Sequence, residues 1–175
     1  MASVANLRSP RIYVACLAAY NAGRLHGAWI EVEDEDVVRG AIAAMLNASP
    51  VAGAEEFAIH DHDGFGGVNI GEYEHIGRVV EIASFLRERG QLGALALAHL
   101  GGSIDDANAA LDDGYRGAYE SLSDYFQELT EETVAIPEAL RLYIDYEAMA
   151  RDAELSGDVF TLRTAHDELH VFWAR

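Results

Sequence analysis

The sequence predicts an α+β fold built from three small consecutive modules in an elongated arrangement. Three observations predict it. Residues 11–61 combine short apolar runs with one amphipathic stretch, strand-like patterns are missing between residues 72 and 158, and two apolar runs flank a polar turn near the end. Glycine-rich residues 64–71 and residues 133–137 are the expected hinges. The modules are therefore 1–66, 67–134 and 135–175.

The first module is expected to be a small antiparallel sheet with one helix across it. Apolar runs predict strands over residues 12–17, 28–32 and 57–60. Asp34 or Asp36 can cap a helix that runs to about Leu46. Its buried face is expected to hold Val37, Ala41, Ala44 and Met45.

The second module is expected to contain only short helices joined by glycines. They are predicted over residues 73–89, 91–100, from 103 to about 113, and 115–132, with breaks at Gly90, Gly101 and Gly114. The fourth of these helices has an apolar seam of Tyr119, Leu122, Phe126 and Leu129.

The third module combines one helix with a β-hairpin. Pro137 introduces a helix over residues 138–155, which Gly157 ends. Strands are predicted over residues 159–163 and 169–173, around a turn at residues 165–168.

Charge excludes two classes of protein. The chain has 30 Asp and Glu against 12 Lys and Arg, a formal net charge of -18, yet half of its residues are hydrophobic. Intrinsic disorder is excluded, because disordered chains lack this much apolar surface. Direct nucleic-acid binding is excluded too, because phosphate contacts require clustered Lys and Arg. All twelve cations are Arg, so the acidity of a salt-adapted cell is an alternative explanation of the charge.

The expected location is the cytoplasm. Cys16 is the single cysteine, so no intrachain disulfide can form. The apolar run after Arg8 and Arg11 is too short for an export signal, and no run approaches the roughly 20 apolar residues of a membrane helix.

Residues 60–72 hold the one local cluster that suggests a metal. Asp61, Asp63, Gly66 and Glu72 fall at positions 1, 3, 6 and 12 of a calcium loop, but Phe65 stands where an oxygen ligand is needed. His60 and His62 could hold zinc only with a distant third ligand. A calcium- or zinc-binding protein therefore remains an alternative. No nucleophile motif or phosphate loop is recognisable, so we expect no enzyme activity, no cofactor and no catalytic residue.

The acidic residues are concentrated in two blocks. The first acidic block, residues 31–74, has eleven acids and one Arg, and the second, residues 105–132, has nine acids and one Arg. Glu120, Asp124, Glu128 and Glu131 recur at steps of four, four and three, which predicts one column along a helix. A solvated helix face explains this column equally well. The candidate acidic surface comprises Glu31, Glu33, Asp34, Glu35, Asp36, Glu55, Glu56, Asp61, Asp63, Glu72, Glu74, Asp105, Asp106, Asp112, Asp113, Glu120, Asp124, Glu128, Glu131 and Glu132.

Several segments resemble the ArdA-type antirestriction proteins. Near the start these are RIYVACLAAYNAG at residues 11–23 and HGAWI at residues 26–30. Near the end they are IPEAL at residues 136–140, YIDYEAMARD at residues 143–152 and HVF at residues 170–172. The order and spacing of these segments are similar to the family over nearly the whole chain.

The resemblance implies a non-enzymatic inhibitor of type I DNA restriction-modification enzymes. Its acidic surface would imitate bent duplex DNA and bind the methyltransferase core. The resemblance also implies an elongated homodimer. Two chains carry a net charge of -36, comparable to about 18 base pairs of duplex. We expect Leu142, Tyr143, Tyr146 and Met149 to contribute to the dimer contact.

Overall fold

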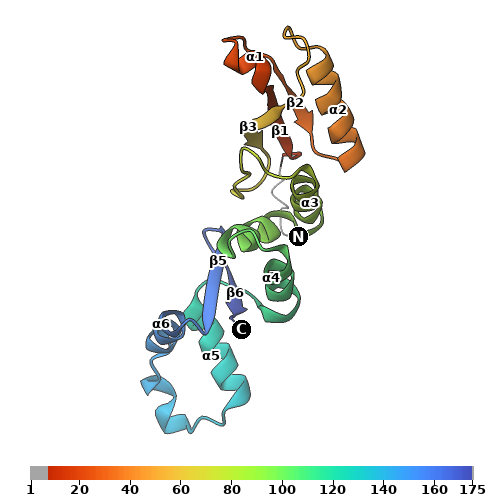
Figure 1. Cartoon of the computed structure of the whole chain (residues 1–175). Helices are drawn as coiled ribbons and strands as arrows, with labels where there is room; N and C mark the ends of the chain where they lie inside the picture. Colours follow the sequence, from red (N-terminus) through yellow and green to blue (C-terminus); the bar gives the residue numbers. More distant parts are fainter. Residues whose placement is uncertain (1–7, 175) are drawn as a thin grey trace. The chain divides into compact units, whose positions relative to one another are not determined.

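The computed structural model describes residues 8–174 and confirms the α+β class (Figure 1). The chain forms two compact units that divide between Ile104 and Asp105. Within the described residues, each unit contains one three-stranded antiparallel sheet with helices. The division into modules 1–66, 67–134 and 135–175 stays a prediction.

The first unit is built on the sheet order β2-β1-β3. Its elements are β1 (Arg11–Cys16), α1 (Leu17–Asn21), β2 (Gly27–Glu31), α2 (Glu35–Asn47), β3 (Phe57–Asp63) and α3 (Ile76–His99). The central strand β1 buries Ile12 and Val14 completely, because both neighbouring strands and the helices enclose that face. The three predicted strands are confirmed, whereas the short helix α1 was missed.

Helix α2 begins where the sequence predicted, but its buried face differs. The Asp34 carboxylate accepts hydrogen bonds from the backbone N–H groups of Asp36 and Val37, at 2.9 and 3.2 Å. The expected buried face was wrong except at Met45, since Val37 is 55% exposed and the helix buries Val38, Ile42 and Met45. Val38 and Ile42 carry bulkier side chains than Ala41 and Ala44, and the helix turns them toward the sheet.

Helix α3 confirms the break predicted at Gly90. Two helical stretches meet at a kink within Ile76–His99, where Gly90 has the non-helical angles φ 63° and ψ -153°. The start at residue 73 was wrong. The His75 side chain caps the helix by accepting from the Gly77 N–H, and Tyr73 lies in the preceding exposed turn.

The second unit is built on the sheet order β4-β6-β5. Its elements are α4 (Ile104–Ala109, whose first residue precedes the division), the π-helical turn η1 (Ala110–Gly114), β4 (Tyr115–Tyr119), α5 (Leu122–Thr133), the 3-10 helix η2 (Glu138–Tyr143), α6 (Tyr146–Ser156), β5 (Val159–Ala165) and β6 (Glu168–Trp173). The predicted hairpin is confirmed as β5 and β6. Its core joins Leu122, Phe126, Ala150, Val159 and Val171.

The predicted helix over residues 115–132 was wrong in its first third. Residues Tyr115–Tyr119 form strand β4, which pairs with β6 more than fifty residues later. Helix α5 starts after Ser121, whose hydroxyl accepts from the Asp124 N–H at 3.2 Å. The alternation of Tyr115, Gly117 and Tyr119 suits a strand edge, and pairing with β6 outweighs the local helical pattern.

Gly117 provides a test of this correction, because a helix and a strand at this position predict opposite effects of Gly117→Ala on stability. In a helix, Gly117→Ala would raise stability by about 1 kcal/mol. In strand β4, Gly117 lies at a register shift with φ 117°, a conformation that L side chains rarely adopt. We therefore expect Gly117→Ala to lower the free energy of unfolding by about 1–3 kcal/mol, measured by urea denaturation. A stabilised variant would contradict the strand assignment.

The predicted helix over residues 138–155 was also wrong, because it is divided in two. Residues Glu138–Tyr143 form η2, Ile144 is extended, and α6 begins at Tyr146. The Asp145 carboxylate accepts from the Ala148 N–H at 2.9 Å and so starts a new helix. No helix in the described part of the chain is both long enough and apolar enough to cross a membrane.

Candidate acidic surface

The two acidic blocks fall in different units of the structure. All members of the first block lie in the first unit and all members of the second block lie in the second unit. In the first unit the carboxylates occupy strand ends, the connections between elements and the first turn of α2. Glu31 ends β2, Glu33 and Asp34 precede α2, Glu35 and Asp36 begin α2, Glu55 and Glu56 precede β3, Asp61 and Asp63 lie on β3, and Glu72 and Glu74 precede α3.

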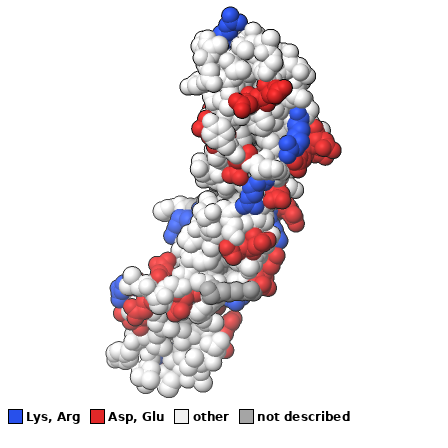
Figure 2. Space-filling model, viewed as in Figure 1, with Lys and Arg blue, Asp and Glu red and all other residues white. Residues whose placement is uncertain are grey.

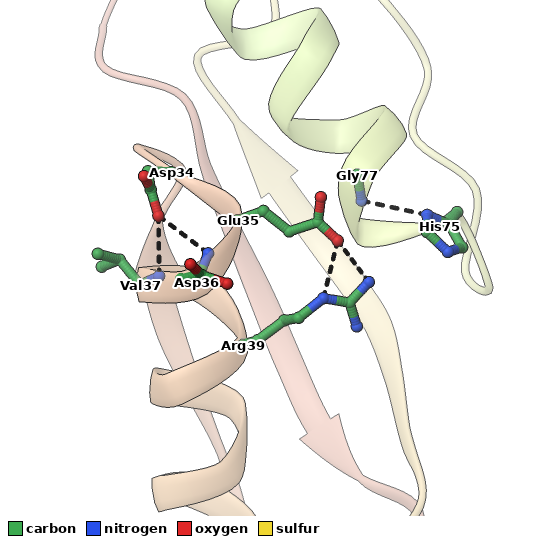
Figure 3. A network of polar contacts seen from close by, with 7 residues as sticks. All are labelled: Asp34, Glu35, Asp36, Val37, Arg39, His75 and Gly77. Atoms are coloured by element: carbon green, nitrogen blue, oxygen red, sulfur yellow. Dashed lines mark hydrogen bonds and ion pairs between the residues drawn. The ribbon is translucent and has the colours of Figure 1, made fainter.

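The first turns of α2 and α3 meet at Glu35 (Figure 3). Arg39, one turn further along α2, donates to Glu35 Oε1 from Nε and Nη2 at 2.8 and 2.6 Å. A Cβ built on Gly77 would lie 3.1 Å from Glu35 Oε2, so the carboxylate sits close to the start of α3. Acids at helix N-termini are favoured by the helix dipole. Asp34 and Glu35 therefore stabilise the ends of these helices in addition to carrying negative charge.

Asp61 and Asp63 lie on strand β3, which extends three residues beyond the strand predicted over residues 57–60. Arg11 Nε and Nη2 donate to Asp63 Oδ2 at 3.2 and 3.0 Å, and these hydrogen bonds hold the pKa of Asp63 below its usual value. The His62 ring accepts from the Ile70 N–H. Among the described residues, no group of three or more His, Cys, Asp or Glu is placed to hold a metal ion. The calcium or zinc alternative thus finds no ligand set there.

In the second unit the predicted helical column is shorter than expected. Glu120 lies in the connection between β4 and α5, so its place on a helix was wrong. Asp124, Glu128 and Glu131 do share the exposed side of α5. Asp105 and Asp106 lie in the first turn of α4, Asp112 and Asp113 in η1, and Glu132 near the end of α5.

All three carboxylates of this column have local partners, and Glu131 Oε1 accepts from the Gln127 side-chain amide at 3.1 Å. The Asp124 carboxylate accepts from the Ser121 hydroxyl at 2.6 Å, and the same hydroxyl caps the helix by accepting from the Asp124 N–H. Glu128 Oε1 accepts from the Tyr119 hydroxyl at 3.2 Å. Burial, reinforced by the charge of Glu128, raises the pKa of Tyr119. Glu128 is therefore held in place while remaining exposed.

Several arginines bind main-chain carbonyls and leave carboxylates unneutralised. Arg87 donates to the carbonyls of Val32 and Glu33 at 2.7 and 3.1 Å, and Arg24 donates to the Pro50 carbonyl. Acidic side chains are exposed on both units (Figure 2). Within residues 8–174, arginine forms no ion pair with the exposed acids Glu33, Asp36, Glu55, Glu56, Glu120, Glu128, Glu131 and Glu132.

The four residues expected at a dimer contact lie on two elements instead of one helix. Leu142 and Tyr143 belong to η2 and are 94% and 83% exposed, whereas Tyr146 and Met149 belong to α6. A groove of about 440 Å³ is lined by Leu142, Tyr143 and Tyr146 together with Ser123, Gln127, Ile144, Asp145 and Glu147. The structure therefore brings three of the four residues to one groove.

The sequence analysis missed two clusters of interacting side chains that depend on strand pairing. Arg11 reaches Asp63 across the sheet and also stacks on Trp29. In the second unit, His170 Nδ1 lies 2.9 Å from Tyr115 Oη and Nε2 lies 2.7 Å from Thr164 Oγ1. Burial lowers the pKa of His170, and the nearby Glu168 partly opposes this. No local motif signals either group, because the partners come from separate strands.

Comparison with known proteins identifies a family. A family model described as "Antirestriction protein (ArdA)" matches residues 12–168. No curated protein matches the chain.

Proposed function

The chain belongs to the ArdA family of antirestriction proteins, and we propose that it acts by presenting carboxylates where its target expects the phosphates of DNA. Antirestriction is the function of the family, whose members are inhibitors rather than enzymes. Mimicry needs no cofactor and no catalytic residue, because occupying a groove is sufficient to exclude DNA from it.

The observation that carries this proposal is the set of exposed carboxylates that have no arginine partner. Eight such acids, four in each block, are named above. A sequence selected only for stability would neutralise them, since like charges repel. A basic groove that binds DNA would be attracted to them, and complementary charge accelerates association.

We propose the methyltransferase core of a type I restriction-modification enzyme as the partner, in the cytoplasm. With Glu120 outside the helix, α5 offers three aligned carboxylates about 5–6 Å apart along its axis. Duplex DNA carries about one charge per 1.7 Å, so one helix is too sparse to replace it. Mimicry therefore depends on many acidic elements acting together.

The same reasoning favours a homodimer. One chain has a net charge of -18, equivalent to about 9 base pairs, and two chains double that length. Leu142 and Tyr143 are large, apolar and almost fully exposed, which is unusual for side chains with no partner. We propose that the groove beside them, with Tyr146 and Met149, contributes to the dimer contact.

Competition for a purified type I methyltransferase tests the proposed function. The full chain is titrated into the enzyme bound to a fluorescent duplex, across a series of salt concentrations. We expect displacement of DNA at low salt and a steady loss of affinity as salt rises, because the Debye length falls from about 30 Å at 0.01 M to about 10 Å at 0.1 M. An acidic protein of a salt-adapted cell would instead leave the DNA bound at every salt concentration and gain stability in molar salt.

A further inference from the structure

The outer face of the first unit's sheet carries a compact group of aromatic and charged side chains. Residues directly opposite each other in antiparallel strands point to the same face. The register places Tyr13 between Trp29 and Asp61, and Arg11 between Glu31 and Asp63. The opposite face carries the buried Ile12, Val14 and Ile30. The outer sheet face is defined as Arg11, Tyr13, Trp29, Glu31, Asp61 and Asp63.

These side chains hold one another in place. The Arg11 guanidinium lies 4.7 Å from the centre of the Trp29 ring while donating two hydrogen bonds to Asp63. The Tyr13 and Trp29 rings are 5.6 Å apart. A Cβ on Gly27 would lie 2.8 Å from the Tyr13 ring, so glycine is needed for that ring to lie across β2. Side chains ordered in advance lose little entropy when a partner binds.

Trp29 is the unusual member of this face, because it is 44% exposed despite its contacts. Tryptophan, tyrosine and arginine are the residues that most often dominate the energy of protein–protein interfaces. Around them, Arg8 joins Arg11 at Asp63 with an ion pair of 3.7 Å, so three carboxylates outnumber two guanidiniums and the face keeps a net negative charge. A fitting partner is therefore a basic protein surface that also offers apolar or cationic side chains to an aromatic ring.

We propose that the outer sheet face is a contact surface for the basic DNA-binding groove of the restriction enzyme, with Trp29 as its main aromatic contact. This proposal rests on the proposed function and adds to it a specific aromatic contact. Carboxylate mimicry supplies an attraction that salt weakens. Burial of Trp29 against the groove supplies a part of the affinity that salt does not weaken.

The competition assay with Trp29→Ala separates these two contributions. We expect the affinity to fall about 10- to 30-fold, as for a typical interface hot spot. The slope of log affinity against log salt should stay unchanged, because no charge is removed. Tyr73→Ala is the matched control, since Tyr73 is an exposed aromatic side chain of the same unit outside the outer sheet face. We expect Tyr73→Ala to bind like the unaltered chain.

A second measurement avoids truncating the side chain. In a Trp173→Phe chain, Trp29 is the only tryptophan and can be replaced by 5-hydroxytryptophan during expression, so that its fluorescence is excited separately from the enzyme's tryptophans. We expect acrylamide quenching of this residue to decrease when the methyltransferase binds.

The outcomes distinguish this proposal from the proposed function. If the unaltered chain displaces DNA but Trp29→Ala displaces it equally well, and quenching is unchanged in the complex, the contact is overturned and mimicry stands. If the unaltered chain does not bind at all, the proposed function itself has failed.

Discussion

Neutralising eight exposed carboxylates, four in each acidic block, is expected to lower the affinity for a type I methyltransferase by about 100-fold at low salt. The changes raise the formal net charge from -18 to -10. Each exposed charge contributes only about 0.2–1 kcal/mol to an interaction, so a large effect requires many changes together. The eight are Glu33→Gln, Asp36→Asn, Glu55→Gln, Glu56→Gln, Glu120→Gln, Glu128→Gln, Glu131→Gln and Glu132→Gln.

These eight positions are chosen because neutralising their side chains should leave the fold intact. The set omits Asp34, which caps α2, and Asp124, which accepts from the capping Ser121 hydroxyl. It also omits Glu35 and Asp63, which bind arginine. Glutamine at position 128 can still accept the hydrogen bond from Tyr119. Circular dichroism should therefore show an unchanged fold, and the free energy of unfolding should rise slightly as repulsion is relieved.

A smaller, charge-matched pair of variants separates charge placement from total charge. The first carries Glu120→Gln, Glu128→Gln, Glu131→Gln and Glu132→Gln. The second carries Glu88→Gln, Glu154→Gln, Asp152→Asn and Asp167→Asn, all exposed and all outside the two blocks. Both raise the net charge by four, but only the first is expected to weaken binding substantially. Equal inhibition by the eight-residue variant and the unaltered chain would reject electrostatic mimicry.

Much of the fold could be predicted where local chemistry decides it. Asp34 begins α2 because its carboxylate satisfies backbone N–H groups two and three residues later. Gly90 kinks α3 because only glycine takes its conformation readily. The hairpin of β5 and β6 follows from alternation around a short turn. In each case the deciding partners lie within a few residues.

The largest error arose where the deciding partner is distant in sequence, although the local caps at His75 and Asp145 were also missed. Strand β4 exists because Gly117 and Ala118 pair with Val171 and His170, which no local pattern reveals. Because residues 115–119 form a strand and not the start of α5, Glu120 does not belong to the acidic column of α5. The candidate acidic surface could be predicted from residue counts alone. The fold decides which of its acids lack an arginine partner, because an arginine can bind main-chain carbonyls instead, as Arg87 does.

A substitution in the sheet of the second unit is expected to have the largest effect on the free energy of unfolding. Phe172 is fully buried on the central strand β6, and its register partners on either side are Phe160 and Tyr115. The rings of Phe160 and Phe172 stack with centres 4.8 Å apart and an interplanar angle of 3°, and Tyr115 lies 5.2 Å away. Phe172→Ala is expected to cost about 3–5 kcal/mol of the free energy of unfolding, because it leaves a cavity between three strands.

In a Trp29→Phe chain, Trp173 is the remaining tryptophan, so tryptophan fluorescence reports on the unfolding of the second unit alone. The Trp173 indole N–H donates to the Tyr125 hydroxyl at 2.6 Å, so its fluorescence senses the packing of α5 against the sheet. Leu155→Ala is the control, because an 80% exposed side chain outside the proposed dimer contact should change the free energy of unfolding by less than about 0.5 kcal/mol. A cost below about 1 kcal/mol for Phe172→Ala would mean that β4 and β5 do not pack on β6 through this ring.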